Sequence, residues 1–458
     1  MRKFILFIVI VLSLVVVALA LTPWHSVLES KIRKTLTASG FSPVSLRVTG
    51  IGLHGVAIED LQLGADAVLR FQNVNLSYNL QGLRQNKLDT LTVIGPRVQM
   101  HESPQGWVIQ GAEGLFVADE NASPRTVASL TALLQVLPFE VIAVSEGILT
   151  IRGNDLDAGL PLDGRYDKAQ GRITYQGDQA SFRKGAISAR MDALKATLLW
   201  DGAAQQWQGD WSADNIVVQG AGADVPVLKA AGTMHAGGTT LRLDGALQSA
   251  DRAYHINFSY EYFLEPGKAP LLTLHDANMP WKQGRLKLGA VKWPLDGVPR
   301  DLSLNVKAEN ISVGELLGAV TGQRVQATGT ISGNVPLTLK ANGDIELHNG
   351  SLIAAAPGKI MLPPDAIPGD NEKIKLVRDI LANLDYSNLA IRMDSDQNND
   401  LGILMTVEGR NPAIYDGRAV KLNVNLTGDV LDFIRQNVML LTRPEALWEQ
   451  ENVQPTTP

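Results

Sequence analysis

Apolar and polar residues alternate one by one in short runs along most of the chain. In the segment 327–359, Ile331, Val335, Leu337 and Leu339 stand two or four residues apart, with mostly polar residues between them. A period of two predicts a β-strand that has one apolar face. Runs of the same kind lie at 44–48, 56–58, 74–80, 91–93, 148–151, 173–175, 197–200, 216–218, 241–243, 256–260, 302–306, 389–393 and 422–426. The sequence therefore predicts a mainly β protein.

Asn-Gly and Asp-Gly pairs punctuate these runs, and both favour the positive φ angles of tight hairpin turns. The seven pairs begin at Asp163, Asp201, Asp244, Asp296, Asn342, Asn349 and Asp416. Parallel strands need long crossover connections, and the pattern shows no such connections. We therefore expect an elongated antiparallel meander in which these pairs turn the chain.

Helical spacing of apolar residues interrupts the strands in only a few places. The predicted amphipathic helices lie at 22–40, 123–138, 311–320, 374–384 and 430–441. The polar segment 442–458 predicts a disordered tail. No low-complexity linker divides the body, and a softer boundary lies near residue 310.

The N-terminus predicts export of the chain. Arg2 and Lys3 precede an apolar run of 18 residues, 4–21, and a helix of that length spans about 27 Å, close to the hydrocarbon core of a bilayer. We interpret residues 1–21 as a transmembrane signal anchor. A cleavable signal peptide is the alternative, because Ala18-Leu19-Ala20 resembles a cleavage site. For a bacterial protein, the anchor predicts a single-pass inner-membrane protein with its bulk in the periplasm.

Composition excludes several classes of function. A net charge of -6 without a basic excess argues against a nucleic-acid partner. The absence of cysteine excludes disulfides, thiolate metal sites and a thiol nucleophile. The seven histidines are scattered singly, and no phosphate-binding loop, nucleophile elbow or dinucleotide fingerprint is present. We predict no metal, no cofactor and no enzymatic activity.

Two local patterns suggest chemistry but favour a simpler interpretation. The segment 394–402 looks like an acidic Ca²⁺ loop, but Asn399 stands where the loop needs glycine and Met405 where it needs glutamate. A polar hairpin loop explains it better. The aromatic residues Tyr166, Tyr175, Trp200, Trp207 and Trp211 suggest a sugar-stacking surface, but aromatics are ordinary strand residues.

A sheet with one apolar face must bury that face. The chain does so either by folding into closed sandwiches and barrels, or by curling into an open trough whose inner face stays apolar. Periodicity alone favours neither. An open trough exposes more apolar surface than soluble monomers usually tolerate, and such surfaces bind apolar partners. Next to a bilayer, the apolar ligand in question is a lipid acyl chain.

The C-terminal third resembles the YdbH family of the AsmA-like and TamB-like periplasmic proteins, most specifically over residues 310–441. The similar segments are Thr328-Gly329-Thr330-Ile331-Ser332-Gly333, Val335-Pro336-Leu337, Asn349-Gly350-Ser351-Leu352, Leu384-Asp385-Tyr386-Ser387-Asn388-Leu389 and Glu408-Gly409-Arg410-Asn411-Pro412. The resemblance implies intermembrane phospholipid transport through an open hydrophobic β groove. It also implies a small outer-membrane lipoprotein that pairs with the C-terminal strand edge.

The combined prediction divides the chain into an anchor (1–21), a juxtamembrane helix (22–40), an AsmA-like groove region (41–310), a YdbH-like region (311–441) and a tail (442–458). The candidate groove residues are Leu76, Leu243, Leu304, Ile331, Val335, Leu337, Leu339, Ile391 and Val424. Alternation does not tell which strand register faces inward. The alternatives are a periplasmic scaffold that assists outer-membrane protein assembly by β-augmentation, and a glycan-binding or glycan-cleaving β protein.

Overall fold

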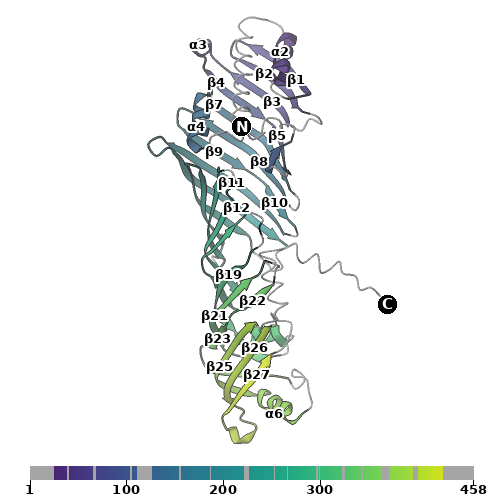
Figure 1. The fold of residues 1–458 in the computed structure, drawn as a ribbon, viewed down its shortest axis with the longest axis vertical. Coiled ribbons are helices and arrows are strands. Elements are labelled where there is room, and N and C mark those ends of the chain that lie inside the picture. Colours follow the sequence, from purple (N-terminus) through teal and green to yellow (C-terminus); the bar gives the residue numbers. More distant parts are fainter. Residues whose placement is uncertain are drawn as a thin grey trace, which may run out of the picture. The chain divides into compact units, whose positions relative to one another are not determined.

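A computed structural model provides the fold (Figure 1). It describes residues 25–38, 41–64, 69–103, 106–110, 126–153, 156–185, 187–220, 226–251, 253–265, 267–295, 298, 300–321, 325–341, 344–363, 371–395 and 401–426. The predicted anchor at 1–21, the helix at 430–441 and the tail lie outside these residues. Within them, no helix combines the length and the apolar character needed to cross a membrane.

The described residues form two units. Unit 1 holds those up to Gln219 and those within Val225–Gly245 and Tyr260–Pro270, and unit 2 holds those within Gly220–Asp224, Ala246–Ser259 and Leu271–Pro458. The division falls within two strands, β14 (Thr240–Ser249) and β15 (His255–Phe263). Strands dominate both units, which confirms the mainly β prediction.

Unit 1 begins with a helix and continues almost entirely as strands. Its elements are α2 (His25–Ala38), β1 (Val44–Gly52), β2 (Gly55–Leu63), β3 (Leu69–Ser77), α3 (Leu80–Arg84), β4 (Leu88–Ile94), β5 (Arg97–Ser103), β6 (Gly106–Ile109), α4 (Val127–Val136), β7 (Phe139–Arg152), β8 (Leu156–Asp167), β9 (Arg172–Gly177), β10 (Ala180–Lys184), β11 (Ile187–Asp201), β12 (Gln206–Gln219) and β13 (Leu228–Gly237). The strand predicted to reach Leu80 ends at Ser77, because Asn79 caps α3 by accepting the Gly82 N–H at 2.6 Å.

One part of the meander is parallel, and there the antiparallel prediction was wrong. β4 and β5 follow each other along β7, and both pair with it in the parallel sense. The connection that makes this possible contains β6 and α4, which the alternation pattern did not show as a crossover. The other strand pairs described in unit 1 are antiparallel, as predicted.

Three of the predicted Gly turns are not turns. Asp163 lies inside β8 and Asp244 inside β14, and both strands continue past the pair. Asn349, with φ of 50°, is a bulge between two short strands that continue along the same neighbour. Asp201 and Asp416 do lie in turns, as predicted. The pairs at Asp296 and Asn342 are outside the described residues.

A line of residues with positive φ crosses the sheet of unit 1, and we call it the crease. Its members, on neighbouring register positions, are Asp60 in β2, Gly95 between β4 and β5, Glu146 in β7, Gln179 between β9 and β10, Ala193 in β11 and Asn215 in β12. In β7, β11 and β12 the residue adds one position against the neighbouring strand, which is a β-bulge. Bulges bend strands and increase their twist. The crease therefore bends several neighbouring strands at one level.

A side chain from the neighbouring strand accepts the backbone N–H of one crease residue and of two bulge residues in unit 2. Asp163 accepts the Glu146 N–H at 2.7 Å. In unit 2, Ser332 accepts the Asn310 N–H at 2.9 Å, and Asp394 accepts the Asn349 N–H at 3.2 Å. Two of the residue pairs that resembled turns, those at Asp163 and Asn349, thus face or form a bulge.

Removing the Asp163 carboxylate, which accepts the Glu146 N–H, is expected to destabilise unit 1. The variant Asp163→Ala leaves the Glu146 N–H without its carboxylate partner, which costs about 1.5–3 kcal/mol for a hydrogen bond to a charged group. Glu146→Gly acts in the opposite direction by about 1 kcal/mol, because glycine adopts positive φ without strain. Urea unfolding followed by tryptophan fluorescence measures both. Asp157→Ala, which removes an exposed ion pair with Arg183, is the control and is expected to stay near wild type.

Unit 2 has a closed core. Its elements are β16 (Leu271–Trp281), β17 (Gly284–Leu288), β18 (Val291–Pro294), β19 (Leu302–Ser312), α5 (Val313–Thr321), β20 (Gln326–Ala327), β21 (Thr330–Leu339), β22 (Ile345–Leu347), β23 (Gly350–Ala354), β24 (Gly358–Met361), α6 (Glu372–Leu381), β25 (Leu384–Ser395), β26 (Leu401–Arg410), a 3₁₀ turn (Tyr415–Gly417) and β27 (Val420–Leu426). Leu317 from α5 and Leu381 from α6 are buried in one cluster with side chains of β21 to β26. Tyr386, 1% exposed, donates its hydroxyl to the Thr328 carbonyl at 2.8 Å. The two helices thus close the apolar face of this sheet.

Four of the predicted helices are confirmed. They are α2, α4, α5 and α6, which lie within or close to the segments predicted at 22–40, 123–138, 311–320 and 374–384. The loop at 394–402 joins β25 and β26, whose flanking residues Ser395 and Leu401 pair directly. This confirms the hairpin interpretation of that segment.

Candidate functional site

The strands β7 to β13 of unit 1 place mostly apolar side chains on one side and mostly polar side chains on the other along several register rows. One row of aligned residues is Ile142, Tyr166, Ile173, Leu198, Gly209 and Met234, and a second is Val144, Gly164, Tyr175, Ala196, Trp211 and Gly232. The row between them, whose side chains point to the opposite side, is Ala143, Arg165, Thr174, Thr197, Asp210 and Thr233. We call the two sides of these strands the apolar side and the polar side.

The apolar side continues across the crease. In β12, Ala213 and Ile216 are 1% and 7% exposed although they are three residues apart. The extra residue of the bulge between them returns the alternation to the same side. Beyond the crease the next apolar row is Ile151, Ala158, Phe182, Ala189 and Val218, and the polar row is Arg152, Asp157, Arg183, Ser188 and Gln219.

Many side chains on the apolar side are not fully buried by the described residues of unit 1. Phe182 is 38% exposed, and a set of aliphatic side chains is only partly buried. That set is Val144, Leu149, Ile151, Leu160, Leu162, Ile173, Met191, Leu194, Leu198 and Met234. In unit 2, by contrast, Ile311, Ile331, Ile345, Leu347, Leu384, Leu389 and Val407 are all 0% exposed. The same alternation therefore gives a closed core in one unit and a half-covered face in the other.

Helix α4 covers one end of the apolar side. Thr131 of α4 is 2% exposed and accepts the indole N–H of Trp207 at 2.7 Å. The helix begins with the Val127 N–H donating to the Gly238 carbonyl at 2.8 Å. Tyr166 and Trp207 meet edge to face with ring centroids 6.4 Å apart. These aromatics form a small core under α4, so Tyr166 and Trp207 offer no stacking surface for a sugar.

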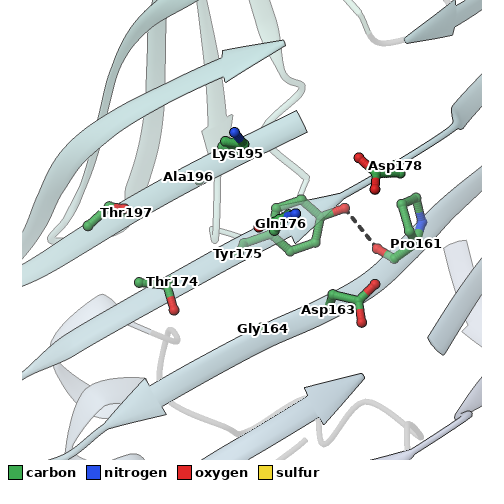
Figure 2. Close-up of a pocket in the computed structure, with 10 residues that line it drawn as sticks. All are labelled: Pro161, Asp163, Gly164, Thr174, Tyr175, Gln176, Asp178, Lys195, Ala196 and Thr197. Carbon is green, nitrogen blue, oxygen red and sulfur yellow. Dashed lines mark hydrogen bonds between the residues drawn. The ribbon is translucent and has the colours of Figure 1, made fainter. Parts of the chain in front are cut away.

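Figure 2 shows a hollow lined by residues of β8, β9 and β11. Its lining includes Thr174, Gln176 and Lys195, and the Tyr175 hydroxyl donates to the Pro161 carbonyl at 2.8 Å. Burial, and then the negative charge of Asp163, raise the pKa of Tyr175. Because the Asp163 carboxylate accepts a bulge amide, its position here is explained by the fold. The described residues hold no group of three or more acidic or histidine side chains placed to bind a metal.

The nine residues predicted to line a groove fall into two groups. Leu76, Ile331, Leu337, Leu339 and Ile391 are buried, with exposures between 0% and 5%. Leu243, Leu304, Val335 and Val424 are partly buried, and the last three pack against the core of unit 2. Leu243 stands two residues from Leu241, which packs on the aromatic core under α4. That these nine residues line a groove stays a prediction.

None of the nine predicted groove residues lies on β7 to β13, the strands that carry the half-covered face, because Leu243 belongs to β14. Leu194, Ala196 and Leu198 alternate with Lys195 and Thr197 in β11. The signal for a strand with one apolar face was therefore present. What the sequence did not contain was a sign that this face, unlike that of unit 2, has no helix packed over most of it.

Comparison with known protein families gives one match. Residues 255–439 match the family model YdbH-like, described as "Intermembrane phospholipid transport protein YdbH". This segment is similar to the YdbH-like family. No significant match was found among curated proteins or among solved structures. The resemblance expected over residues 310–441 is thus confirmed, and the match begins earlier, within β15.

The YdbH-like segment contains most of unit 2, with its closed core, and ends beyond β27. The half-covered apolar side of β7 to β13 lies before it in the chain. The family match and the candidate surface are therefore independent observations, from different parts of the protein.

Proposed function

We propose that this protein carries phospholipid between two membranes, with acyl chains held on the apolar side of β7 to β13. The observation that supports this most is the partial exposure of that side, from Val144 in β7 to Met234 in β13. The description of the YdbH-like family, which names intermembrane phospholipid transport, supports the same function independently. Non-enzymatic transport also agrees with the lack of a recognisable catalytic motif in the sequence.

The surface matches an acyl chain in chemistry and in size. Removing a methylene group from water is worth about 0.8 kcal/mol, so a carrier must cover the chains along their length. Six strand positions, β7, β8, β9 with β10, β11, β12 and β13, span about 24 Å at a spacing of ~4.8 Å. A chain within one leaflet occupies roughly 15 Å, half of the hydrocarbon core.

The sequence also suggests where in the cell this surface lies. Residues 4–21 anchor the chain in the inner membrane, with the described units in the periplasm. The phospholipid headgroup stays in water, beyond the edge of the apolar side. At the other end of the described chain, β27 pairs with β26, and the edge of β27 is the place where a small outer-membrane lipoprotein adds a strand.

The experiment is mass spectrometry of lipid that co-purifies with the full chain after mild detergent extraction. We expect phospholipid at a stoichiometry that survives gel filtration. A chain that is folded by circular dichroism but carries no phospholipid, even after incubation with vesicles, contradicts the proposal.

A further inference from the structure

The end of unit 1 that carries the first strand presents a basic helix face. In α2, Leu28, Ile32 and Leu36 are buried against the sheet. Glu29 is the only acidic residue of the helix, and its carboxylate accepts the Val48 N–H at 2.9 Å. Since that acid is turned toward β1, the outward face of α2 carries positive charge only.

Three basic residues form this outward face. Lys31, Arg33 and Lys34 are exposed, and they make no ion pair with any residue that the structure describes. A stretch of positive charge on one side of a helix matches a negatively charged partner surface.

Two exposed leucines, one in a turn and one at the start of a helix, belong to the same unit as α2. Leu53, in the turn between β1 and β2, is 69% exposed, and Leu80, the first residue of α3, is 58% exposed. Tyr78 joins the two loops: its N–H donates to the His54 carbonyl at 3.0 Å and its hydroxyl to the Gly52 carbonyl at 2.6 Å. Tyr78 therefore ties the turn that carries Leu53 to the segment that leads into Leu80. Figure 1 shows α2 and α3 at the same end of unit 1.

The chain leading into α2 limits how far this end lies from a bilayer. Four peptide units separate Leu21, the end of the apolar run, from His25, the start of α2, and they reach at most about 14 Å. The headgroup layer on each side of the hydrocarbon core is roughly 5–8 Å thick. With residues 4–21 in the membrane, α2 therefore begins in or beside the headgroup layer.

We propose that Lys31, Arg33, Lys34, Leu53 and Leu80, which we call the basic-leucine surface, dock unit 1 onto an anionic lipid bilayer. The basic side chains lie against acidic headgroups, and the two leucines enter the interface. This orients the first strands of the sheet toward the lipid source. The proposal rests on the membrane anchor of the proposed function.

The test uses the full chain, reconstituted in vesicles of phosphatidylcholine with phosphatidylglycerol. Because the natural chain has no cysteine, Leu53→Cys and Leu80→Cys each give one site for an environment-sensitive fluorophore. Leu199→Cys, at an exposed leucine of β11 (50%), is the matched control. We expect quenching by spin-labelled lipid at positions 53 and 80, and none at 199.

The second part of the test removes the positive charges of α2. A Lys or Arg near an anionic surface strengthens binding about fivefold, so K31Q/R33Q/K34Q weakens docking by about 100-fold. We expect quenching at positions 53 and 80 to fall in this variant, in high salt and in vesicles of phosphatidylcholine alone, while the chain still floats with the vesicles.

The flotation and quenching results distinguish failure of the surface proposal from failure of the anchor. A chain that floats with vesicles but shows no quenching at positions 53 and 80 overturns the basic-leucine surface and leaves the anchor intact. A chain that does not float overturns the anchor and the surface together. Quenching that is equal at position 199 overturns the assignment of this end of unit 1.

Discussion

Replacing Leu337 with aspartate is expected to unfold unit 2. Leu337 is 4% exposed and pairs with Leu304 on one side and Leu347 on the other, inside the closed core. A carboxylate there is buried without a partner, which costs several kcal/mol. Domains are stable by only about 5–15 kcal/mol, so the loss is a large share of the total. Circular dichroism and urea unfolding measure it.

Asn334→Asp is the control on the same strand. Asn334 is exposed and pairs with Lys307 across the strands, so a carboxylate there faces water and a positive charge. We expect stability close to wild type. If Leu337→Asp unfolds no more readily than Asn334→Asp, the core of unit 2 is not closed as the structure describes it.

Replacing Leu194 with aspartate is expected to remove bound lipid and to leave the fold intact. Leu194 is partly buried, belongs to none of the core clusters, and pairs with Gly177, which has no side chain to bury a charge against. Without ligand the new carboxylate is hydrated. With an acyl chain on the apolar side it loses that water, which costs more than 1.4 kcal/mol and lowers lipid retention at least about tenfold. Mass spectrometry of co-purified phospholipid measures the effect.

Thr174→Asp is the matched control, because Thr174 lies on the polar side and pairs with Arg165. It adds the same charge to a neighbouring strand, and we expect lipid retention to stay at the wild-type level. Equal retention in both variants, or unfolding of Leu194→Asp, argues that the apolar side is not the place where lipid binds.

The strands β11 and β21 were both predictable from the sequence, but the different burial of their apolar faces was not. Alternation predicted strands with one apolar face in β11 and β21 alike, and both strands formed. Leu337 and Leu194 have the same pattern around them. They differ in cover, because α5 and α6 close the core of unit 2 while α4 covers only one end of the apolar side of unit 1. Whether a helix packs over an apolar face depends on contacts between segments that are distant in the sequence. A period-two pattern within one strand does not encode such contacts.

The turn prediction failed at Asp163 and Asn349 for a local physical reason. Asn and Asp next to glycine favour positive φ and hydrogen bonds to nearby backbone. A β-bulge uses the same preferences without reversing the chain. Asn349 adopts positive φ in a bulge, and Asp163 caps the bulge at Glu146. Of the three pairs that do not turn the chain, only the one at Asn349 has a residue with positive φ.

The parallel pairing of β4 and β5 with β7 escaped prediction because its crossover looks like ordinary meander. It contains one short strand, β6, and the helix α4, which was predicted as an insertion. The consequence for the site is direct. This crossover returns the chain through α4, which places Thr131 against Trp207 at one end of the apolar side.

Site-specific photocrosslinking is the most direct test of the claim that the apolar side of unit 1 holds acyl chains. A benzophenone amino acid is placed at Leu160 or Leu194 on the apolar side, and at Arg165 or Thr197 on the polar side, in a chain exposed to phospholipid. The account predicts lipid adducts at Leu160 and Leu194 and none at Arg165 and Thr197. Adducts of equal yield on both sides, or none at Leu160 and Leu194 in a folded chain, contradict it.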